Sequence, residues 1–426
     1  MTGEILILAL LALFALNLPI ALAIGLATAA AILYQGEYSL MMVVQRMYAG
    51  TDSFHLLAVP LFMFAGVLME AGGVSRRIVD LASALVGWLP GGMAVVAVLS
   101  AMFFAGVSGS AAADTAAVGA ILIPAMKRTG YDSDFAASVQ AAGGSVGVII
   151  PPSIPMIIFG FLTGASIGQL FAAGILPGIL IGFCLMATAG FISHRRGYSH
   201  TKEFSWAEVL STLRRAGLAL GTPAIILGGI IFGVFTATES AAVAVVYTLA
   251  LGMFVYRGIK LRDLMPLVKK AAITSAVVMF IISTASAFAW VAAIEDLPGR
   301  LSGALLGITA NPLALLLLVN LVLLIVGTIV ETSAALILLV PILTAMLPAL
   351  GIDLIHLGVI VVTNLAIGML TPPMGICLIV SGSISGDSLG AVSRRIWPFL
   401  AVLLLDLLVI SLFPPLSLWM ARLVGN

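Results

Sequence analysis

Long apolar runs recur along the whole chain and leave little material for a water-soluble domain. Of its 426 residues, 62% are hydrophobic and only 9% are charged, whereas soluble domains carry about 25% charged residues. Each long run meets the requirement of about 20 residues for a membrane-spanning helix. The longest polar stretch, 194–215, is only a connecting loop. The composition therefore predicts an all-α polytopic membrane protein in contact with membrane lipid.

The N-terminal run "ILILALLALFALNLPIALAIGLATAAAIL" lacks the basic start and the short core of a signal peptide, so we expect a mature membrane segment. It could form one long helix or two short ones divided at Asn17 to Pro19, and the repeat described below favours two. The net charge of +1 gives no indication of nucleic-acid binding. Cys184 and Cys377 are isolated among apolar residues and are interpreted as structural.

Basic residues gather on one side of the predicted topology, which the positive-inside rule assigns to the cytoplasm. The residues placed there are Arg76, Arg77, Lys127, Arg128, Arg195, Arg196, Lys202, Arg214, Arg215, Arg257, Lys260, Arg262, Lys269, Lys270, Arg394 and Arg395. Two of these basic loops are separated by an apolar stretch that must enter the membrane and return. We therefore expect an interfacial helix beginning at Val74 and then a re-entrant hairpin over residues 92–126.

The two halves of the chain share an ordered set of motifs. "DTAAVGAILIP" matches "ETSAALILLVP", and "GYD" followed by "GVIIPP" matches "GID" followed by "GMLTPP". By the charge argument the copies begin on opposite sides, which predicts an inverted repeat with halves 1–205 and 206–426. The second half would contain a hairpin over 311–351. The spacing between the motifs is four residues longer in the second copy, so we expect one hairpin arm to be longer by about one turn.

Paired prolines interrupt an apolar segment in each half, in the expected broken helices 135–163 and 355–384. Proline removes an amide donor, so Pro151 and Pro152 must leave carbonyls near Val148 to Ile150 without partners. Such backbone is tolerated in a membrane where it lines a polar cavity, and there it can bind a small cation. We predict that the hairpin tip Ser108 to Ser110 and this break form an oxygen cage for Na⁺. The equivalent second cage would combine 327–332 with 370–375. The alternative is an ordinary proline kink with glycine-rich packing, which two matching copies disfavour.

Acidic residues within a membrane are functional hypotheses by default. Asp114 and Glu331 each precede a threonine that we expect to open a helical arm, and either cation coordination or helix capping would explain them. Glu239 could likewise be functional or open a helix capped by Thr238. Asp406 has no counterpart in the repeat and could face a partner subunit. No lysine follows a glycine, which excludes a Walker A motif and favours an ion gradient as the energy source.

The segments "GVSGSAAADTAAVGAILIPAMKRTGYD", "GGSVGVIIPPSIPMIIFG", "GVFTATESAAVAVVY" and "GMLTPPMG" resemble the large membrane subunit of tripartite ATP-independent periplasmic (TRAP) transporters. The resemblance covers essentially the whole chain. It implies an inner-membrane, Na⁺-driven importer of a small organic acid with an elevator-type fold and no enzymatic activity. It also implies two partners, a small membrane subunit on a separate chain and a periplasmic substrate-binding protein. The glutamate motif of the family has a proline where Ala237 stands here, which predicts a looser turn.

The resemblance places ion-binding positions at Ser108, Gly109, Ser110, Pro151, Ser153, Gly327, Thr332, Thr371 and Pro372. It places the substrate between the two tips, where we expect contacts from Ser110, Ser153, Thr332 and Thr371. Asp114, Glu239 and Glu331 would support the sites. Three other interpretations remain open: a self-sufficient secondary carrier or ion exchanger, an intramembrane serine protease built on "GVSG", and a structural scaffold. The protease is disfavoured because no histidine is expected near Ser108 at membrane depth.

Overall fold

Helices are the regular secondary structure of the part of the chain that the computed structural model describes, residues 2–16, 18–198, 203–309 and 311–424. The helices of the first half are α1 (Thr2–Ala15), α2 (Ile20–Gln35), α3 (Leu40–Ala49), η1 (Phe54–Leu57), α4 (Ala58–Ala71), α5 (Val74–Val86), α6 (Gly92–Ser108), α7 (Ala111–Arg128), α8 (Ser133–Ser145), η2 (Val146–Val148), α9 (Ile154–Thr163) and α10 (Ile167–Arg195). Those of the second half are α11 (Trp206–Ile231), α12 (Ala237–Ala250), η3 (Leu251–Val255), η4 (Leu261–Asp263), α13 (Leu264–Ile294), α14 (Leu297–Ile308), α15 (Pro312–Ile329), α16 (Thr332–Ala345), α17 (Leu347–Leu350), α18 (Leu354–Gly368), α19 (Ile376–Ser385), α20 (Leu389–Leu412) and α21 (Pro415–Val424). Asn17 and Lys202 lie outside the described residues.

Seven helical segments of the described chain are long and apolar enough to cross a membrane. They are Phe54–Ala71, Ile167–Arg195, Trp206–Ile231, Ala237–Val255, Leu261–Ile294, Pro312–Ile329 and Leu389–Leu412. Between them lie shorter apolar helices, including α9 of the first proline-broken pair and both members of the second, α18 and α19. The prediction of an all-helical polytopic membrane protein is confirmed.

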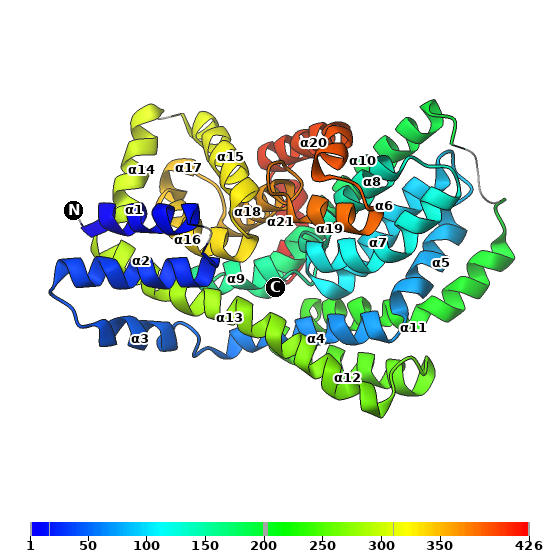
Figure 1. The fold of residues 1–426 in the computed structure, drawn as a ribbon, viewed down its shortest axis with the longest axis horizontal. Coiled ribbons are helices and arrows are strands. Elements are labelled where there is room, and N and C mark those ends of the chain that lie inside the picture. Colours follow the sequence, from blue (N-terminus) through cyan, green and yellow to red (C-terminus); the bar gives the residue numbers. More distant parts are fainter. Residues whose placement is uncertain (1, 17, 199–202, 310, 425–426) are drawn as a thin grey trace.

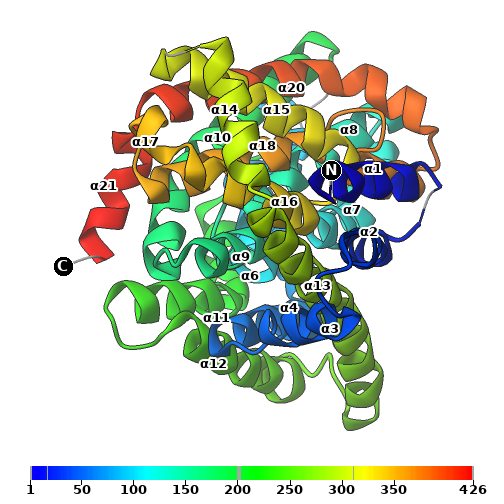
Figure 2. The same cartoon turned by 90° about the vertical axis from the view of Figure 1, so that its left-hand side faces the viewer.

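Two groups of helices lie at different heights in both views (Figures 1 and 2). One group, called the lower layer here, consists of α3, α4, α11, α12 and α13 and runs along the bottom of both views. The α6–α7 and α15–α16 hairpins lie above it with the broken helices, α8–α9 and α18–α19, and are called the hairpin layer. Contacts of α4 and α11 with α6, and of α13 with α16, join the two layers.

The hairpins and broken helices exchange partners between the two halves of the chain. Helix α7 packs on α8 and also on α19, the second half of the other broken helix. In the same way α16 packs on α18 and also on α9. The Pro151–Pro152 and Pro372–Pro373 peptide bonds, one in each break, are both cis. Each half therefore covers helix faces of the other half. Separating the two halves would expose the faces of α7, α9, α16 and α19 that are in contact.

Polar side chains cap the helices at the tips and breaks. Ser110 begins α7 and Ser153 begins α9, each accepting a hydrogen bond from a backbone amide three residues onward. Asn311 and Glu331 cap α15 and α16 by accepting from amides two and three residues onward, and Asp353 caps α18 by accepting from the amide two residues onward. A capping side chain satisfies an amide that has no partner within its helix. Capping therefore determines where these short helices start inside an otherwise apolar sequence.

Helix breaks divide both the N-terminal apolar run and the end of the second hairpin into separate helices. The N-terminal run forms two helices, with α1 ending at Ala15 and α2 beginning at Ile20. The four additional residues of the second copy do not lengthen a hairpin arm continuously, because α16 ends at Ala345 and a separate helix α17 spans Leu347–Leu350. Pro348 lies at the start of α17, where its missing amide donor costs nothing.

Asp406 does not face outward toward a partner subunit. Asp406 lies on α20 and is only 5% exposed. Its carboxyl group lies beside the thiol of Cys184 on α10. The prediction was wrong because the chain covers this carboxylate itself, through the α10–α20 contact.

Candidate functional site

The first hairpin tip and the first proline break meet directly, and together they are called the first junction here (108–114 with 147–154). The amide of Ile154 donates a hydrogen bond to the carbonyl of Gly109 over 3.3 Å. Gly109 has a φ of +64°, and a Cβ there would lie 2.6 Å from the Pro152 carbonyl oxygen. Only glycine permits this approach of two backbones. The junction thus brings the predicted residues Ser108, Gly109 and Ser110 together with the break.

Ser153 partly repairs the broken helix. Its hydroxyl donates to the Val148 carbonyl and accepts from the amide of Met156 over 3.3 Å. The expectation that the carbonyls from Val148 to Ile150 all lack partners is therefore wrong at Val148. The hydroxyl of a serine just after the prolines can donate to a carbonyl on the other side of the break. Considering only the amide donors that proline removes does not predict this bond.

Asp114 lies at the centre of the first junction and is fully buried. Its Oδ1 accepts a hydrogen bond from the Ser108 hydroxyl, whereas its Oδ2 has no hydrogen-bond partner among the described residues. A Cβ at Gly147 would fall on this Oδ2 atom. A buried carboxylate oxygen without a donor is costly unless a cation compensates it. The junction therefore gathers hard oxygen atoms around a carboxyl oxygen that lacks a donor in the part of the chain described, and either a small cation or a proton would satisfy that oxygen.

The second hairpin and its break, called the second junction (327–333 with 367–375), are built differently. The backbones of α15 and α18 touch at Gly327 and Gly368, where a Cβ on Gly327 would lie 3.3 Å from Gly368 Cα. The Thr332 hydroxyl is buried and has no hydrogen-bond partner within the described part of the chain, while the Thr371 hydroxyl donates to the Ile367 carbonyl over 2.9 Å. Thr371 and Pro372 are half-buried. This junction is more open than the first.

Asp114 and Glu331 do not hold equivalent places, contrary to the expectation from their motifs. Helix α7 begins at Ala111, so Asp114 lies within its first turn. Glu331 is itself the capping residue of α16 and accepts from the amides of Ser333 over 2.8 Å and Ala334 over 3.3 Å. The motifs align in sequence, but the first arm is capped four residues earlier, by Ser110.

Glu239 forms a capping box on α12. Its carboxylate accepts from the amide of Thr236 over 2.8 Å, and the amide of Glu239 donates back to the Thr236 hydroxyl over 3.3 Å. The cap is therefore Thr236 and not Thr238, because the reciprocal geometry requires the hydroxyl residue to precede the carboxylate residue by three positions. Glu239 is exposed. Its carboxylate bonds to Thr236, which belongs to neither junction.

A buried chain of amides was missed by reading the sequence. Asn364 of α18 donates to Asn320 of α15 over 3.0 Å, and Asn320 donates to the Ser411 hydroxyl of α20 over 3.0 Å. Both asparagines are almost fully buried. Asn320 is a single polar residue within an apolar run and Asn364 follows one other polar residue, Thr363, which is the signal that could have identified them.

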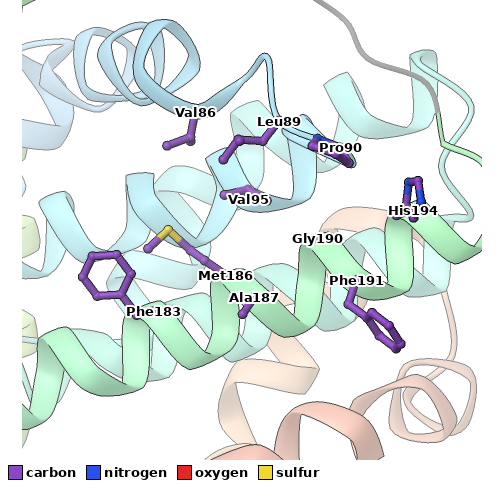
Figure 3. A pocket seen from close by; sticks show the side chains of 10 residues that line it. All are labelled: Val86, Leu89, Pro90, Val95, Phe183, Met186, Ala187, Gly190, Phe191 and His194. Atoms are coloured by element: carbon purple, nitrogen blue, oxygen red, sulfur yellow. The ribbon is translucent and has the colours of Figure 1, made fainter.

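Two cavities differ in their relation to the first junction. One of about 240 Å³ separates the first tip from the lower layer and is lined by residues that include Ser108, Ser110, Gly66 and Lys270. Another of about 500 Å³ lies between α10 and the turn that joins α5 to α6 (Figure 3). Its labelled lining includes Leu89, Phe183 and Phe191, and it shares no lining residue with the first junction. Only the smaller cavity adjoins the predicted ion site.

Fold and site together define an all-helical, multi-pass membrane protein with broken helices around buried oxygen atoms, an arrangement typical of secondary transporters. The chain belongs to the family described as "Tripartite ATP-independent periplasmic transporter, DctM component", whose model matches residues 7–416. It is therefore a transporter permease and not an enzyme, which removes the protease interpretation.

Characterised relatives cover most of the chain. It is 41% identical over 379 residues to the sialic acid TRAP transporter large permease protein SiaM of Vibrio cholerae, covering 89% of each protein. It is 39% identical over 402 residues to the C4-dicarboxylate TRAP transporter large permease protein DctM of Pseudomonas aeruginosa, covering 94% of each. It is 40% identical over 406 residues to the isethionate TRAP transporter permease protein DctMQ of Oleidesulfovibrio alaskensis, covering 95% of this chain but 64% of that longer protein.

The fold is also similar to a solved structure of a distant protein. The Alcanivorax borkumensis YdaH transporter superposes with a TM-score of 0.61 at 13% sequence identity, covering 91% of this chain and 90% of the other. At this identity the likeness concerns the fold alone.

Proposed function

We propose that this chain is the large membrane subunit of a three-part system that takes up a small organic acid together with Na⁺. A periplasmic binding protein would deliver the acid, and a small membrane subunit would assemble with this chain in the bacterial inner membrane. Family membership supports the three-part assembly. The printed names of three relatives mention isethionate, sialic acid and C4-dicarboxylates, all of which are organic acids.

The observation that carries Na⁺ coupling is the buried Asp114 carboxylate with an unpartnered oxygen at the first junction. Na⁺ would be held there by oxygen atoms of Ser108, Gly109, Ser110, Pro151 and Ser153, since hard cations bind oxygen ligands in unwound backbone. The second junction would hold Na⁺ through Gly327, Thr332, Thr371 and Pro372. Na⁺ is cargo in this scheme and leaves with the substrate.

The proposed transport cycle is of the elevator type. The halves 1–205 and 206–426 would form an inverted repeat whose hairpins enter the membrane without crossing it. The hairpin layer would carry acid and Na⁺ past the lower layer, with Ser110, Ser153, Thr332 and Thr371 contacting the acid. Helix α5, which joins the lower layer to the hairpin layer, fits the role of a connecting arm because one face is charged and the other is buried.

The test is uptake into proteoliposomes that contain this chain and its small subunit. Labelled succinate, N-acetylneuraminate and isethionate would be supplied with an inward Na⁺ gradient, with and without the binding protein. We expect uptake of one acid that requires both Na⁺ and the binding protein. Uptake that proceeds without the binding protein would favour a self-sufficient carrier, and uptake that ignores Na⁺ would remove the proposed coupling.

A further inference from the structure

The cavity of about 240 Å³ beside the first junction has two walls of different character. The hairpin layer supplies Ser108, Ser110 and Ile154. The lower layer supplies Gly66 and Glu70 of α4 with Lys270 and Thr274 of α13. Gly66 approaches the tip closely, because a Cβ on it would lie 3.5 Å from Ser108 Cα. The cavity therefore connects the predicted ion-binding tip with charged groups that no motif singled out.

Glu70 and Lys270 are the charged residues among those that line this cavity in the described chain. They are bonded to each other, with Lys270 Nζ donating to Glu70 Oε2 over 2.8 Å. Their side chains are 45% and 56% exposed, respectively. An ion pair as accessible as this one contributes little net stability. Another anion can therefore replace the Glu70 carboxylate on Lys270 at little cost in free energy.

We propose that Lys270 is a substrate-binding cation and that Glu70 competes with the substrate for it. An organic acid that reaches the tip would place its carboxylate or sulfonate group on the Lys270 ammonium, and Glu70 would return to water. One ionic hydrogen bond breaks and one of the same kind forms, so the exchange needs no further reactant. This inference rests on the proposed function, since it requires that the cargo be an acid.

The chemistry of the two walls explains why a lysine is needed there. Serine hydroxyls and the amides at the start of α7 can bind a carboxylate but carry no full charge. Lysine adds a point charge with three donors on a long flexible stem. Glu70 limits the affinity that this charge would otherwise produce, because the acid must displace it. A competitor inside the cavity thus weakens retention and favours release.

The experiment measures equilibrium binding of labelled acid to this chain with its small subunit in lipid nanodiscs with Na⁺. The probe is whichever of succinate, N-acetylneuraminate and isethionate the wild-type system transports. We expect Lys270→Gln to weaken binding about tenfold, the loss of one charged hydrogen bond, and Lys270→Arg to retain it. Glu70→Gln should have the opposite effect and tighten binding about threefold or more, because the competitor is removed.

The opposite signs separate this role from a structural one. If the pair merely joins α4 to α13, Lys270→Gln and Glu70→Gln will both lower thermal stability and neither will tighten binding, which would overturn the inference. Lys269→Gln is the matched control, because Lys269 is exposed on the same helix and does not line the cavity. Wild-type protein that transports none of the acids would overturn the proposed function and this inference with it.

Discussion

At the scale of single residues, Asp114 combines full burial with a carboxyl oxygen that lacks a hydrogen-bond donor within the described chain. It is fully buried, it receives one hydroxyl donor from Ser108, and its second oxygen has none among the described residues. A charged carboxylate in this place costs free energy that a hydrogen bond to one hydroxyl does not recover. The proposed Na⁺ site would supply the missing partner.

Replacing Asp114 by asparagine should weaken Na⁺ binding while preserving the shape of the site. Loss of one charged interaction, about 1.5–3 kcal/mol, corresponds to about a tenfold or larger rise in the Na⁺ concentration for half-maximal uptake. The measurement is the Na⁺ dependence of acid uptake in proteoliposomes. Asp80→Asn, on an exposed position of α5, serves as the control. An unchanged Na⁺ dependence in Asp114→Asn would remove this residue from the ion site.

Gly147 packs against the same carboxylate, so the size of this residue is critical. An alanine methyl group would overlap Asp114 Oδ2, and overpacking of this kind costs about 1–3 kcal/mol. We expect Gly147→Ala to lower the melting temperature in detergent. Gly217→Ala on α11 should leave it unchanged or raise it, since nothing lies within 4 Å of its added methyl group and alanine favours helix. Equal melting temperatures of the two variants would contradict this packing.

At the scale of helices, polar side chains determine which apolar faces meet. Helices α15, α18 and α20 are all strongly apolar, and lipid is as good a neighbour for such faces as another helix. The Asn364–Asn320–Ser411 chain joins one residue from each of the three. Close contact at Gly327 and Gly368 then allows the backbones of α15 and α18 to touch. Specific pairing arises from these few positions.

Removing the central member of that chain should loosen the three-helix contact. Interhelical hydrogen bonds in membranes contribute about 0.6 kcal/mol on average and up to about 1.7 kcal/mol. We therefore expect Asn320→Ala to lower the free energy of unfolding by about 1–2 kcal/mol, measured by titration with denaturing detergent. Thr328→Ala on the same helix should have a smaller effect, because its hydroxyl bonds only to the Ile325 carbonyl of its own helix. A reversed order of the two effects would refute this account.

At the scale of the whole molecule, the hairpin layer meets the lower layer through contacts of α4 and α11 with α6 and of α13 with α16. One such contact brings α6 against α11, where a Cβ on Gly106 would lie 3.1 Å from Pro223 Cβ. Apolar interfaces without directional bonds permit sliding more readily than hydrogen-bonded ones. This arrangement is compatible with the proposed movement of one layer past the other.

A cross-link between the layers tests that movement. Cysteines at Gly106 and Pro223 would have their Cβ atoms near the separation of about 3.8 Å found in disulfides. In a background with Cys184 and Cys377 replaced, we expect oxidation to stop acid uptake and a reductant to restore it. The control is each single cysteine variant under the same oxidant. Full uptake with the disulfide formed, verified by intact mass, would show that these two helices keep their contact during transport.

Several features of this protein could be predicted from consecutive residues. Apolar runs indicate membrane helices, and paired prolines must interrupt a helix wherever they occur. The tips at Ser108 to Ser110 and at 327–332 could be predicted because polar residues are unusual at the centre of an apolar segment. The family itself was identified from motifs that lie at these same interruptions, and family membership is confirmed.

Only the tertiary structure decided which of these segments meet. Helix α7 packs on α19 and α16 on α9, across the two halves of the chain. Asp114 and Glu331 align in sequence but differ in role, and Lys270 lies opposite Ser110 across a cavity. Local rules follow from bonds between neighbouring residues. Long-range pairing depends on the shapes of facing surfaces and on rare polar contacts, and in a chain this apolar the periodicity of hydrophobic residues does not distinguish one helix face from another.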